Sequence, residues 1–410
     1  MNSASVVKIA LLLATGAFGA QSASAAGSLY QAEGLGRWVE GYDLPARGAG
    51  WTAIGTTDPF GTSSINPAAM VWSERPRLAA SFLTENLWMK TEGSSTDRVG
   101  GTRIPAIQAV VPGPSVLRWA FGFRDLTDAR YAVEGIVNPG RGDEYERRLI
   151  GSGGLGELSA TLGARLAGGH LGIAVRGGIV SGTIREELER DFSSGVYDDS
   201  RDLLRTRMES ARPVSVGMQA RVNDRISAGA FYDLSSTLDL ESLLRTTTDI
   251  QLRETAEFEL PAAYGAGLSI RALPRYRISF DVVQRLWSES EFRSDGGEAA
   301  GFRNLKDTIR FGIGLVRLQD RDQTMRDPVL RRALWRAGFT YATLPNESKG
   351  ETVSEWAITG GVGLPIQFDR GYVDGLIEFG KRGDAESTGV GETFLRIGFG
   401  ATFQTLRSAF

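Results

Sequence analysis

The sequence predicts an all-β fold, a 14-stranded antiparallel transmembrane β-barrel. Three observations lead to this prediction. Apolar and polar residues alternate with a period of two from about Arg77 to Phe403, the connections between the alternating segments switch between long and short, and the chain opens with an export signal. Alternation indicates strands with one apolar face, and long loops on one side with tight turns on the other are typical of outer-membrane barrels.

Residues 1–25 have the three parts of a cleaved signal peptide. Lys8 gives a positive start, Ile9 to Ala20 form a short apolar run, and Ala23-Ser24-Ala25 is a small-x-small cleavage site. The chain has no cysteine, which rules out lipoprotein attachment and disulfides. The exported protein must therefore be held together by a core or by a closed sheet.

The overall composition is compatible both with a soluble protein and with a membrane β-barrel. The 410 residues carry a formal net charge of -3 and include 52 glycines, and the mean hydropathy is -0.15. Membrane barrels share such values with soluble proteins because their lumen and loops are polar. No later stretch offers the roughly 18 to 20 apolar residues that a membrane helix needs. The expected location is the outer membrane of a Gram-negative bacterium.

The alternating segments give the strands of the barrel. In one of them, Leu117, Trp119 and Phe121 alternate with Arg118 and Gly122. Segments of this kind predict about fourteen strands, with centres near residues 82, 107, 120, 161, 176, 215, 230, 264, 281, 312, 338, 359, 376 and 398.

The connections between these strands alternate in length. Short turns are expected at 112–115, 168–169, 223–224 and 273–274, and long loops at 90–101, 127–154, 182–205 and 238–255. An even strand count places both ends of the sheet on the periplasmic side, so the first strand can close against the last. Closure leaves no backbone edge in hydrocarbon. A soluble sandwich or propeller is the competing interpretation, but no blade repeat or Greek-key spacing is found.

Residues 26–74 show neither strand nor helix periodicity, and they carry the motif that suggests a family. The segment contains "GLGR" at 34–37 and "RGAGWTAIGTTDPFGTSSINPAAM" at 47–70, with Asn66, Pro67 and Ala68 in sequence, and "RPRLAASF" leads into the first strand. Near the other end stand "GVGLPI" at 361–366 and "IEFGKRG" at 377–383. This layout resembles the FadL/TodX family of outer-membrane transporters of long-chain fatty acids and other hydrophobic compounds.

The resemblance implies a domain organisation and a function. Residues 26–74 would form an N-terminal hatch that plugs the lumen of a barrel made from residues 75–410, with Asn66, Pro67 and Ala68 as the hatch motif. The protein would act as a passive transporter of hydrophobic or amphipathic, long-chain fatty acid-like molecules. These would be captured at extracellular loops and released past the hatch, laterally where the third strand is kinked. Pro112, Gly113 and Pro114 are the candidate start of that gap, although they also suit a plain tight turn.

The face opposite the apolar one is rich in arginine. If the apolar face contacts lipid, the lumen is lined by Arg118, Arg124, Arg176, Arg277, Arg310 and Arg336, among others. Arginine binds carboxylates through two parallel hydrogen bonds, so these residues could guide an anionic amphiphile. They could equally form salt-bridge ladders that brace the barrel or hold the hatch.

An enzyme is the second functional class considered. A lipid deacylase would need a histidine base at the membrane surface, but the one histidine, His170, falls in a predicted periplasmic turn. No catalytic residue, metal or cofactor is expected, and phosphate-binding and dinucleotide motifs are absent from the sequence.

A third class is a scaffold or shuttle for secreted proteins that transports nothing. Transport predicts a continuous apolar path from the loops to the wall, whereas a scaffold predicts a filled barrel and a large apolar loop surface for a partner. The expected partners are a hydrophobic small-molecule substrate, outer-membrane lipid and lipopolysaccharide, and the barrel-assembly machinery. Nucleic acid binding is not expected, and the protein is expected to be a monomer.

Overall fold

The structure is a computed structural model of the 410-residue chain. It describes residues 27–32, 34–57, 64–91, 97–137, 144–192, 197–247, 251–294, 302, 304–319, 327–366 and 371–404. The predicted signal peptide, residues 1–25, lies outside the described residues, as do positions 58–63 of the quoted motif.

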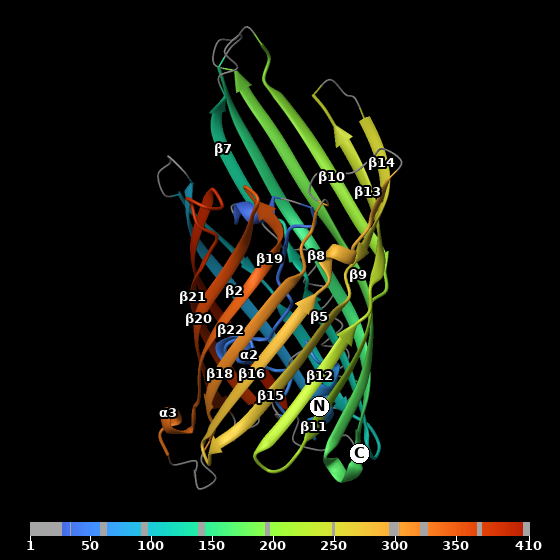
Figure 1. The fold of residues 1–410 in the computed structure, drawn as a ribbon, viewed down its shortest axis with the longest axis vertical. Helices are drawn as coiled ribbons and strands as arrows, with labels where there is room; N and C mark the ends of the chain where they lie inside the picture. The colour runs from blue at the N-terminus through green and yellow to red at the C-terminus, as the bar shows by residue number, and fades with distance from the viewer. Residues whose placement is uncertain are drawn as a thin grey trace.

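Fourteen antiparallel strands close into one barrel within this part of the chain (Figure 1). In chain order they are β2 (Arg77–Thr91), β3 with β4 (Asp97–Arg103, Ala106–Pro112), β5 with β7 (Leu117–Asp125, Tyr131–Val137), β8 (Tyr145–Leu166), β9 (Leu171–Phe192), β10 with β11 (Ser200–Ala211, Val214–Arg221), β12 with β13 (Ile226–Asp233, Ser236–Arg245), β14 with β15 (Gln251–Leu260, Ala263–Leu273), β16 with β17 (Tyr276–Arg285, Phe292–Ser294), β18 (Thr308–Arg317), β19 (Leu334–Ser348), β20 (Glu351–Ile366), β21 (Gly371–Arg382) and β22 (Val390–Gln404). Pairing of β2 with β22 closes the ring. Every predicted strand centre falls on its strand, so strand number and order are confirmed.

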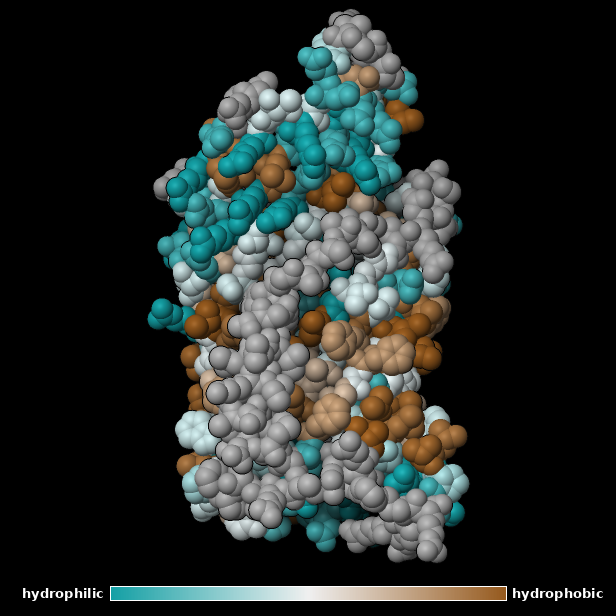
Figure 2. Space-filling view, turned by 180° about the vertical axis from the view of Figure 1, so that it is seen from behind, coloured by the Kyte–Doolittle hydropathy of each residue, from teal (hydrophilic) through white to brown (hydrophobic). Residues whose placement is uncertain are grey.

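The two faces of each strand meet different surroundings, as the alternation predicts. Trp119 and Phe121 in β5 are 43% and 51% exposed, whereas Arg118 and Arg124 in the same strand are 6% exposed. Figure 2 shows brown, apolar residues in a band across the lower half of the molecule and teal residues above it. Apolar side chains pointing outward around a closed ring of strands are the mark of a membrane-spanning barrel.

The two ends of the barrel differ in height. One end carries tight turns, such as the one at η3 (Ala167–Gly169), where Gly168 and Gly169 have φ values of 65° and 93°. At the other end β8 and β9 pair without a break up to Tyr145 and Phe192, and with β7, β10, β13 and β14 they rise above the remaining strands (Figure 1). We call the first the short-turn end and the second the extended end.

The long loops predicted at 127–154, 182–205 and 238–255 were wrong, because most of these residues are strand. They belong to β7 to β10, β13 and β14, where they rise past the apolar band. Their outward face there carries charged residues in place of apolar ones, as in the Arg201–Glu187 and Arg253–Glu241 pairs. A strand that leaves the hydrocarbon no longer needs an apolar outer face, so the alternation fades although the strand continues.

The described residues between 27 and 76, called here the N-terminal segment, lie inside the barrel (Figure 1). The segment contains η1 (Leu29–Gln31), β1 (Arg37–Trp38), α2 (Leu44–Gly48) and η2 (Pro67–Trp72). Asp43 caps α2 by accepting a hydrogen bond from the Ala46 N–H at 3.0 Å. The remaining short elements of the chain are β6 (Thr127–Asp128), η4 (Trp287–Glu289) and α3 (Val329–Arg332).

Small residues let this segment lie close to the wall. Gly50, with a φ of 69°, fits against β18 and β19, and a Cβ there would come within 2.1 Å of the Ile313 carbonyl oxygen. On the other side, Val71 lies over Gly172 and Gly163, where a Cβ would come within 2.3 and 2.7 Å of its methyl groups. Glycine in a strand often marks such a close approach. No described helix is long and apolar enough to cross a membrane.

Candidate functional site

A buried network of arginines and glutamates lies on the inner face of four adjacent strands, β20, β21, β22 and β2. Arg396 of β22 is fully buried and forms ion pairs with Glu85, Glu355 and Glu378 on three other strands. Arg382 joins Glu355 at 2.6 Å and also contacts Glu392. A charge that is removed from water is tolerated only when it is paired and hydrogen-bonded, so these wall residues form a single unit.

The N-terminal segment supplies the rest of this network. Arg37 lies 3.5 Å from Glu85 and Arg47 lies 3.1 Å from Glu378, while the Ser28 hydroxyl donates to Glu392 at 2.7 Å. With these two arginines, four arginines face the four glutamates of the network. The segment is therefore tied to β2, β21 and β22 by charge as well as by packing.

Asn66 holds the hatch motif predicted from the sequence against the wall. Its side-chain oxygen accepts from the Ala68 N–H at 3.0 Å, which caps η2, and its amide donates to the carbonyls of Ile54 and Met218 at 3.1 Å. Pro67 occupies the first turn of η2, where its missing N–H costs nothing. Asn66 thus connects two parts of the N-terminal segment with strand β11.

Two further contacts fix the segment to β16 and to β11, which are separated in the ring by β12 and β15. Asp281 of β16 accepts from the backbone N–H groups of Ala53 and Ile54 at 2.6 and 2.7 Å. Trp72 donates from Nε1 to Gln219 of β11 at 2.6 Å. Close by, burial raises the pKa of the Tyr42 hydroxyl well above its usual value, so this group stays neutral.

The predicted lumen arginines all lie on the inward face, but they are not grouped at one site. Arg118 donates to the Ser73 carbonyl at 2.8 Å, Arg124 and Arg176 share Glu157, Arg310 lies 3.1 Å from Glu40, and Arg336 lies 2.7 Å from Asp374. Arg277 lines a small cavity with Asp43 and Ser279. Arg118, Arg124, Arg176, Arg310 and Arg336 therefore have a carboxylate or carbonyl partner within the protein, and Arg277 also interacts with other groups of the protein.

The third barrel strand is interrupted between β5 and β7. At Leu126 to Arg130 it bends inward but stays bonded to β8, since Leu126 N–H donates to Leu155 at 2.9 Å and Ala129 N–H to Gly153 at 3.0 Å. Gly153 and Gly154 of β8 have φ values of 107° and 151°, which L side chains rarely adopt. The excursion is thus a paired bulge shared by two neighbouring strands.

On its other side, the excursion is not paired with the preceding barrel strand, which β3 and β4 form. The ladder between β4 and β5 ends at Ala106 and Arg124, and among the described residues no backbone pair joins β3 to β7. The N-terminal segment takes the vacated edge: β1 pairs with β6, Arg37 opposite Asp128, and Val39 N–H donates to Leu126 at 2.8 Å. We call the unpaired line between β3 and β7 the seam.

One side chain bridges the seam. Arg130 binds both oxygens of Asp128 at 2.7 Å and also donates to the Thr102 carbonyl of β3 at 2.7 Å. A void of about 20 Å³ beside it is lined by Gly100 and Gly101. A Cβ on Gly101 would lie 2.9 Å from an Arg130 nitrogen, so a side chain added at this position would enter the seam.

The prolines expected to begin a lateral gap lie elsewhere. Pro112 still pairs with Arg118, and the turn that follows is closed by Gly113 N–H donating to Leu117 at 2.9 Å. The structure places Pro112, Gly113 and Pro114 in a tight turn at the short-turn end, at the opposite end of β5 from Leu126. The sequence offers one signal for the true break: the alternation of β5 stops at Asp125.

One apolar cluster connects the base of the raised strands with this break. It contains Leu35, Leu126, Ala129, Leu155, Val180, Ile184, Met208, Ala211, Leu238, Leu240, Phe258, Leu260 and Trp287, with Trp38, Phe292 and Phe302 packed against it. Phe258 lies in the raised strand β14, Phe292 lies opposite it in β17, and Leu126 and Ala129 lie in the excursion itself. We call this cluster the apolar track.

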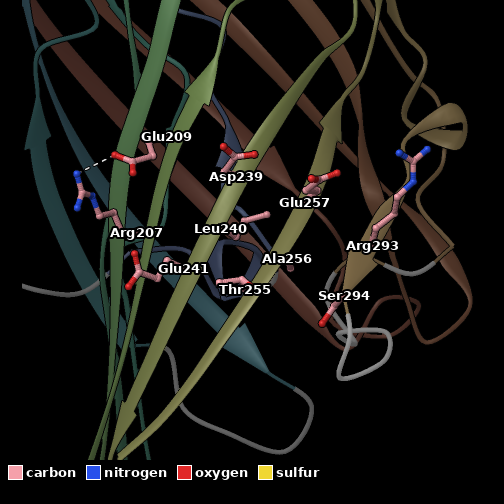
Figure 3. Close-up of a pocket in the computed structure, with 10 residues that line it drawn as sticks. All are labelled: Arg207, Glu209, Asp239, Leu240, Glu241, Thr255, Ala256, Glu257, Arg293 and Ser294. Carbon is pink, nitrogen blue, oxygen red and sulfur yellow. Dashed lines mark ion pairs between the residues drawn. The ribbon is translucent and has the colours of Figure 1, made fainter.

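Two cavities lie in the upper part of the molecule, one inside the barrel and one on its outer surface. The first, of about 210 Å³, lies between the N-terminal segment and the upper parts of β16, β18, β19 and β20, and Trp38, Trp51 and Trp287 line it. The second, of about 610 Å³, is an open groove on the outer side of β10, β13 and β14. Figure 3 shows Glu209, Asp239 and Glu257 side by side across its strands.

Comparison with known proteins identifies the family. A model of the BamG family matches residues 1–405. The chain belongs to the BamG family. Among curated proteins, no match to this BamG-family sequence was found.

Solved structures share the fold of this BamG-family protein. It is similar to a FadL homologue of Pseudomonas aeruginosa, with a TM-score of 0.62 and 12% identity over 90% of this chain and 99% of that one. The toluene transporter TodX of Pseudomonas putida gives 0.61 and 15% over 91% and 99%, and the toluene transporter TbuX of Ralstonia pickettii gives 0.58 and 14% over 89% and 98%. The resemblance to FadL and TodX proteins is confirmed at the level of the fold, which is that of an outer-membrane barrel.

Proposed function

We propose that this BamG-family protein is an outer-membrane channel for the passive transport of hydrophobic or amphipathic small molecules. The observation that carries the proposal is the apolar track, which runs from the base of the raised strands to the excursion beside the seam. An apolar molecule gains free energy wherever apolar surface replaces water, so such a track gives it a downhill path. The FadL homologue and the toluene transporters with this fold support the same reading, and long-chain fatty acids are the amphipathic substrates that the resemblance suggests.

We propose further that residues 26–74 act as the hatch, with the barrel formed by residues 75–410. Support comes from the position of the N-terminal segment in the lumen and from its ties to wall strands on different sides, through Arg47, Asn66 and Asp281. With such ties the hatch stays in place, and substrate must pass beside it. The lumen arginines then brace hatch and wall, which their partners within the protein support.

Replacing Asn66 with alanine tests the hatch motif. The variant loses the cap of η2 and two hydrogen bonds to carbonyls, which we expect to lower stability by about 1–2 kcal/mol. The midpoint of heat-induced unfolding, followed by mobility on semi-native gels, measures this. Pro67→Ala keeps all three bonds and should change the midpoint less; equal losses in the two variants would contradict the assigned role of Asn66.

The exit we propose is lateral, through the seam. The edge of the third strand can be paired either by β1 of the hatch or by β3 of the wall. The register of β4 with β5, continued without a break, would set Arg103 opposite Thr127, where Trp38 now lies. Because β1 and β3 compete for one edge, a docked β1 keeps the seam free of a backbone ladder. Arg130 then remains as the side-chain bridge across it.

Val39→Pro tests this competition. The proline removes the N–H that bonds Leu126, a loss of about 0.5–1.5 kcal/mol, and so shifts pairing toward β3 by up to about tenfold. We expect slower uptake of radiolabelled substrate and greater hydrogen-exchange protection of Asp97 to Arg103. Val39→Ala, which keeps the N–H, is the matched control. Faster uptake in the proline variant would instead favour a simple plug that opens when loosened.

Native mass spectrometry and lipid extraction after purification in a mild detergent test the transport proposal itself. A co-purifying acyl-chain or aromatic compound, together with protein-dependent uptake in proteoliposomes, is the expected result. A barrel that is reproducibly empty, and that also fails to take up added fatty acid and toluene, would exclude transport.

A scaffold for secreted proteins is the second candidate, and the outer groove favours it. The carboxylates of Glu209, Asp239 and Glu257 lie directly opposite one another on adjacent strands, which costs stability within the protein and suits a polar macromolecule. Lipopolysaccharide and the barrel-assembly machinery are proposed as further contacts, and the protein is proposed to be a monomer. Normal uptake by a variant with Glu209, Asp239 and Glu257 changed to glutamine would separate the groove from transport.

A further inference from the structure

The connection between β18 and β19, at the short-turn end, carries the short helix α3. β18 ends at Arg317 and β19 begins at Leu334, whereas two residues suffice to join β15 to β16 at the same end. In Figure 1, α3 lies at the outer edge of this end. Closing the sheet needs only a tight turn here, so the longer connection calls for a further explanation.

Two side chains on the outer face of the wall hold α3. Arg317 of β18 and Trp335 of β19 lie opposite each other, and Tyr276 of β16 continues the same row. Arg317 donates from Nη2 to the Arg331 carbonyl at 3.4 Å, and Trp335 donates from Nε1 to the Leu330 carbonyl at 3.3 Å. The helix backbone is therefore bonded to outward-pointing side chains of the barrel.

This row borders the apolar, lipid-facing band of the barrel. Leu315 and Ile313, further along β18 on the same side of the sheet, are exposed apolar residues of that band. On α3, Val329 and Leu330 are 44% and 60% exposed, so the helix continues the apolar surface beyond the row. Aromatic girdles and helices with an exposed apolar side are typical of the boundary between hydrocarbon and lipid headgroups.

Positive charge surrounds the apolar side chains of α3. Four arginines belong to α3, to the end of β18 and to the adjoining turn, namely Arg275, Arg317, Arg331 and Arg332. Asp327, 3.4 Å from Arg331, is the one acidic residue in the part of this connection that the structure describes. Residues 320–326 add two aspartates and two arginines in the sequence, so the positive excess is unchanged.

From this arrangement we propose that α3 and Arg317 form an interfacial binding site for an anionic phospholipid. The tight turns of an outer-membrane barrel lie in the periplasm, so the leaflet at this end is the inner one, which consists of phospholipid. The acyl chains contact Val329 and Leu330, and the phosphate is bound by Arg317 and Arg331. A guanidinium has five N–H donors, so one bond to a carbonyl or a carboxylate leaves it able to bind phosphate as well.

Two features favour a lipid over a soluble anion or a protein. The apolar side chains adjoin a surface that already contacts lipid, and the arginines match the phosphate that lies at the border of that surface. The proposal rests on the membrane location of the barrel and is independent of transport.

The depth of α3 in a membrane tests the proposal first. Because the chain has no cysteine, Leu330→Cys carries a single nitroxide spin label in vesicles of phosphatidylethanolamine and phosphatidylglycerol. The label should collide more with oxygen, which dissolves in lipid, than with a water-soluble nickel complex. Arg225→Cys, in the exposed turn between β11 and β12, is the matched control that should report water. Equal access of nickel to both labels, as a protein-docking face would show, would overturn the proposal.

Native mass spectrometry of the full chain in detergent tests the charge preference. Phosphatidylglycerol should bind more tightly than phosphatidylcholine with the same acyl chains, and Arg317→Gln and Arg331→Gln should each weaken phosphatidylglycerol binding by about fivefold. Arg225→Gln should bind like the parent, and mobility on semi-native gels checks that every variant is folded. An equal loss in Arg225→Gln, or no loss in Arg317→Gln and Arg331→Gln, would contradict the assigned site.

A further variant separates a lipid from a soluble phosphate. Leu330→Asn keeps every charge but removes an apolar side chain, and it should weaken phosphatidylglycerol binding by about tenfold. Excess glycerol phosphate should not displace the lipid. Displacement by glycerol phosphate, together with parent-like binding by Leu330→Asn, would show a site for soluble phosphate and exclude the lipid. None of these measurements depends on uptake, so the site can fail while transport stands, and the reverse.

Discussion

Replacing Arg396 with methionine is expected to lower the free energy of unfolding by about 3–5 kcal/mol, the usual cost of removing one partner from a buried ion pair. Methionine fills a similar volume, but it leaves Glu85, Glu355 and Glu378 with one positive partner fewer among residues that water does not reach. The side chain also lies over the ring of Phe394, at 3.8 Å from its centroid, so packing is lost as well. Denaturant unfolding in detergent micelles measures the change, and the fraction that runs as folded barrel on semi-native gels reports assembly.

An exposed pair provides the control for Arg396. Arg293 of β17 contacts Glu291, where both side chains are more than half exposed, and such pairs contribute about 0–1 kcal/mol. Arg293→Met should therefore unfold almost like the parent. If Arg396→Met also unfolds like the parent, the network does not hold the N-terminal segment to the wall as its geometry indicates.

Replacing Gly101 with leucine is expected to block lateral release. The new side chain would meet Arg130 within the seam, and overpacking of this kind costs about 1–3 kcal/mol. If the added side chain destabilises the open form of the seam by this amount, the rate of uptake falls by about five- to a hundredfold. The φ of Gly101 is one that other residues adopt, so the backbone itself need not be strained. Initial rates of toluene and fatty acid uptake into proteoliposomes are the measurement.

Gly177→Leu is the matched control for the seam. Gly177 lies in β9, far from the excursion, and a Cβ there meets nothing within 4 Å. Uptake by this variant should equal that of the parent. Equal uptake by Gly101→Leu and Gly177→Leu, with both variants folded, would show that substrate leaves by another route.

The barrel could be predicted from sequence because lipid imposes a simple rule on it. Residues such as Trp119 and Phe121 must face outward while Arg118 and Arg124 face inward, and this two-residue period survives in the sequence without any knowledge of partners. Where the strands rise above the lipid, both faces meet water or protein, and the period no longer separates strand from loop. This is why residues such as those of β10 were predicted as loop.

For the interior, the sequence predicted the type of residue in the lumen but not its partners. Arginine was expected in the lumen, but the pairing of Arg47 with Glu378 joins positions 331 residues apart, and nothing local selects that glutamate. The third-strand break was expected at two prolines, the residues that lack an N–H. It depends instead on a glycine pair in the neighbouring strand and on β1, which takes the hydrogen bonds that β3 leaves. Such a break is a property of three segments together.

The ties between the first and last parts of the chain also set an order of assembly. Ser28 bonds Glu392 across 364 residues, and Arg47 bonds a strand next to the one that closes the ring. A ring that has already closed admits a folded segment only through its two mouths, and the Arg47–Glu378 contact lies between them, in the middle part of β21. The N-terminal segment, which is synthesised first, can therefore form its final contacts only when the last strands are in place. Closure of the barrel and burial of the N-terminal segment then occur together. A substitution at Ser28 therefore also affects the wall at Glu392.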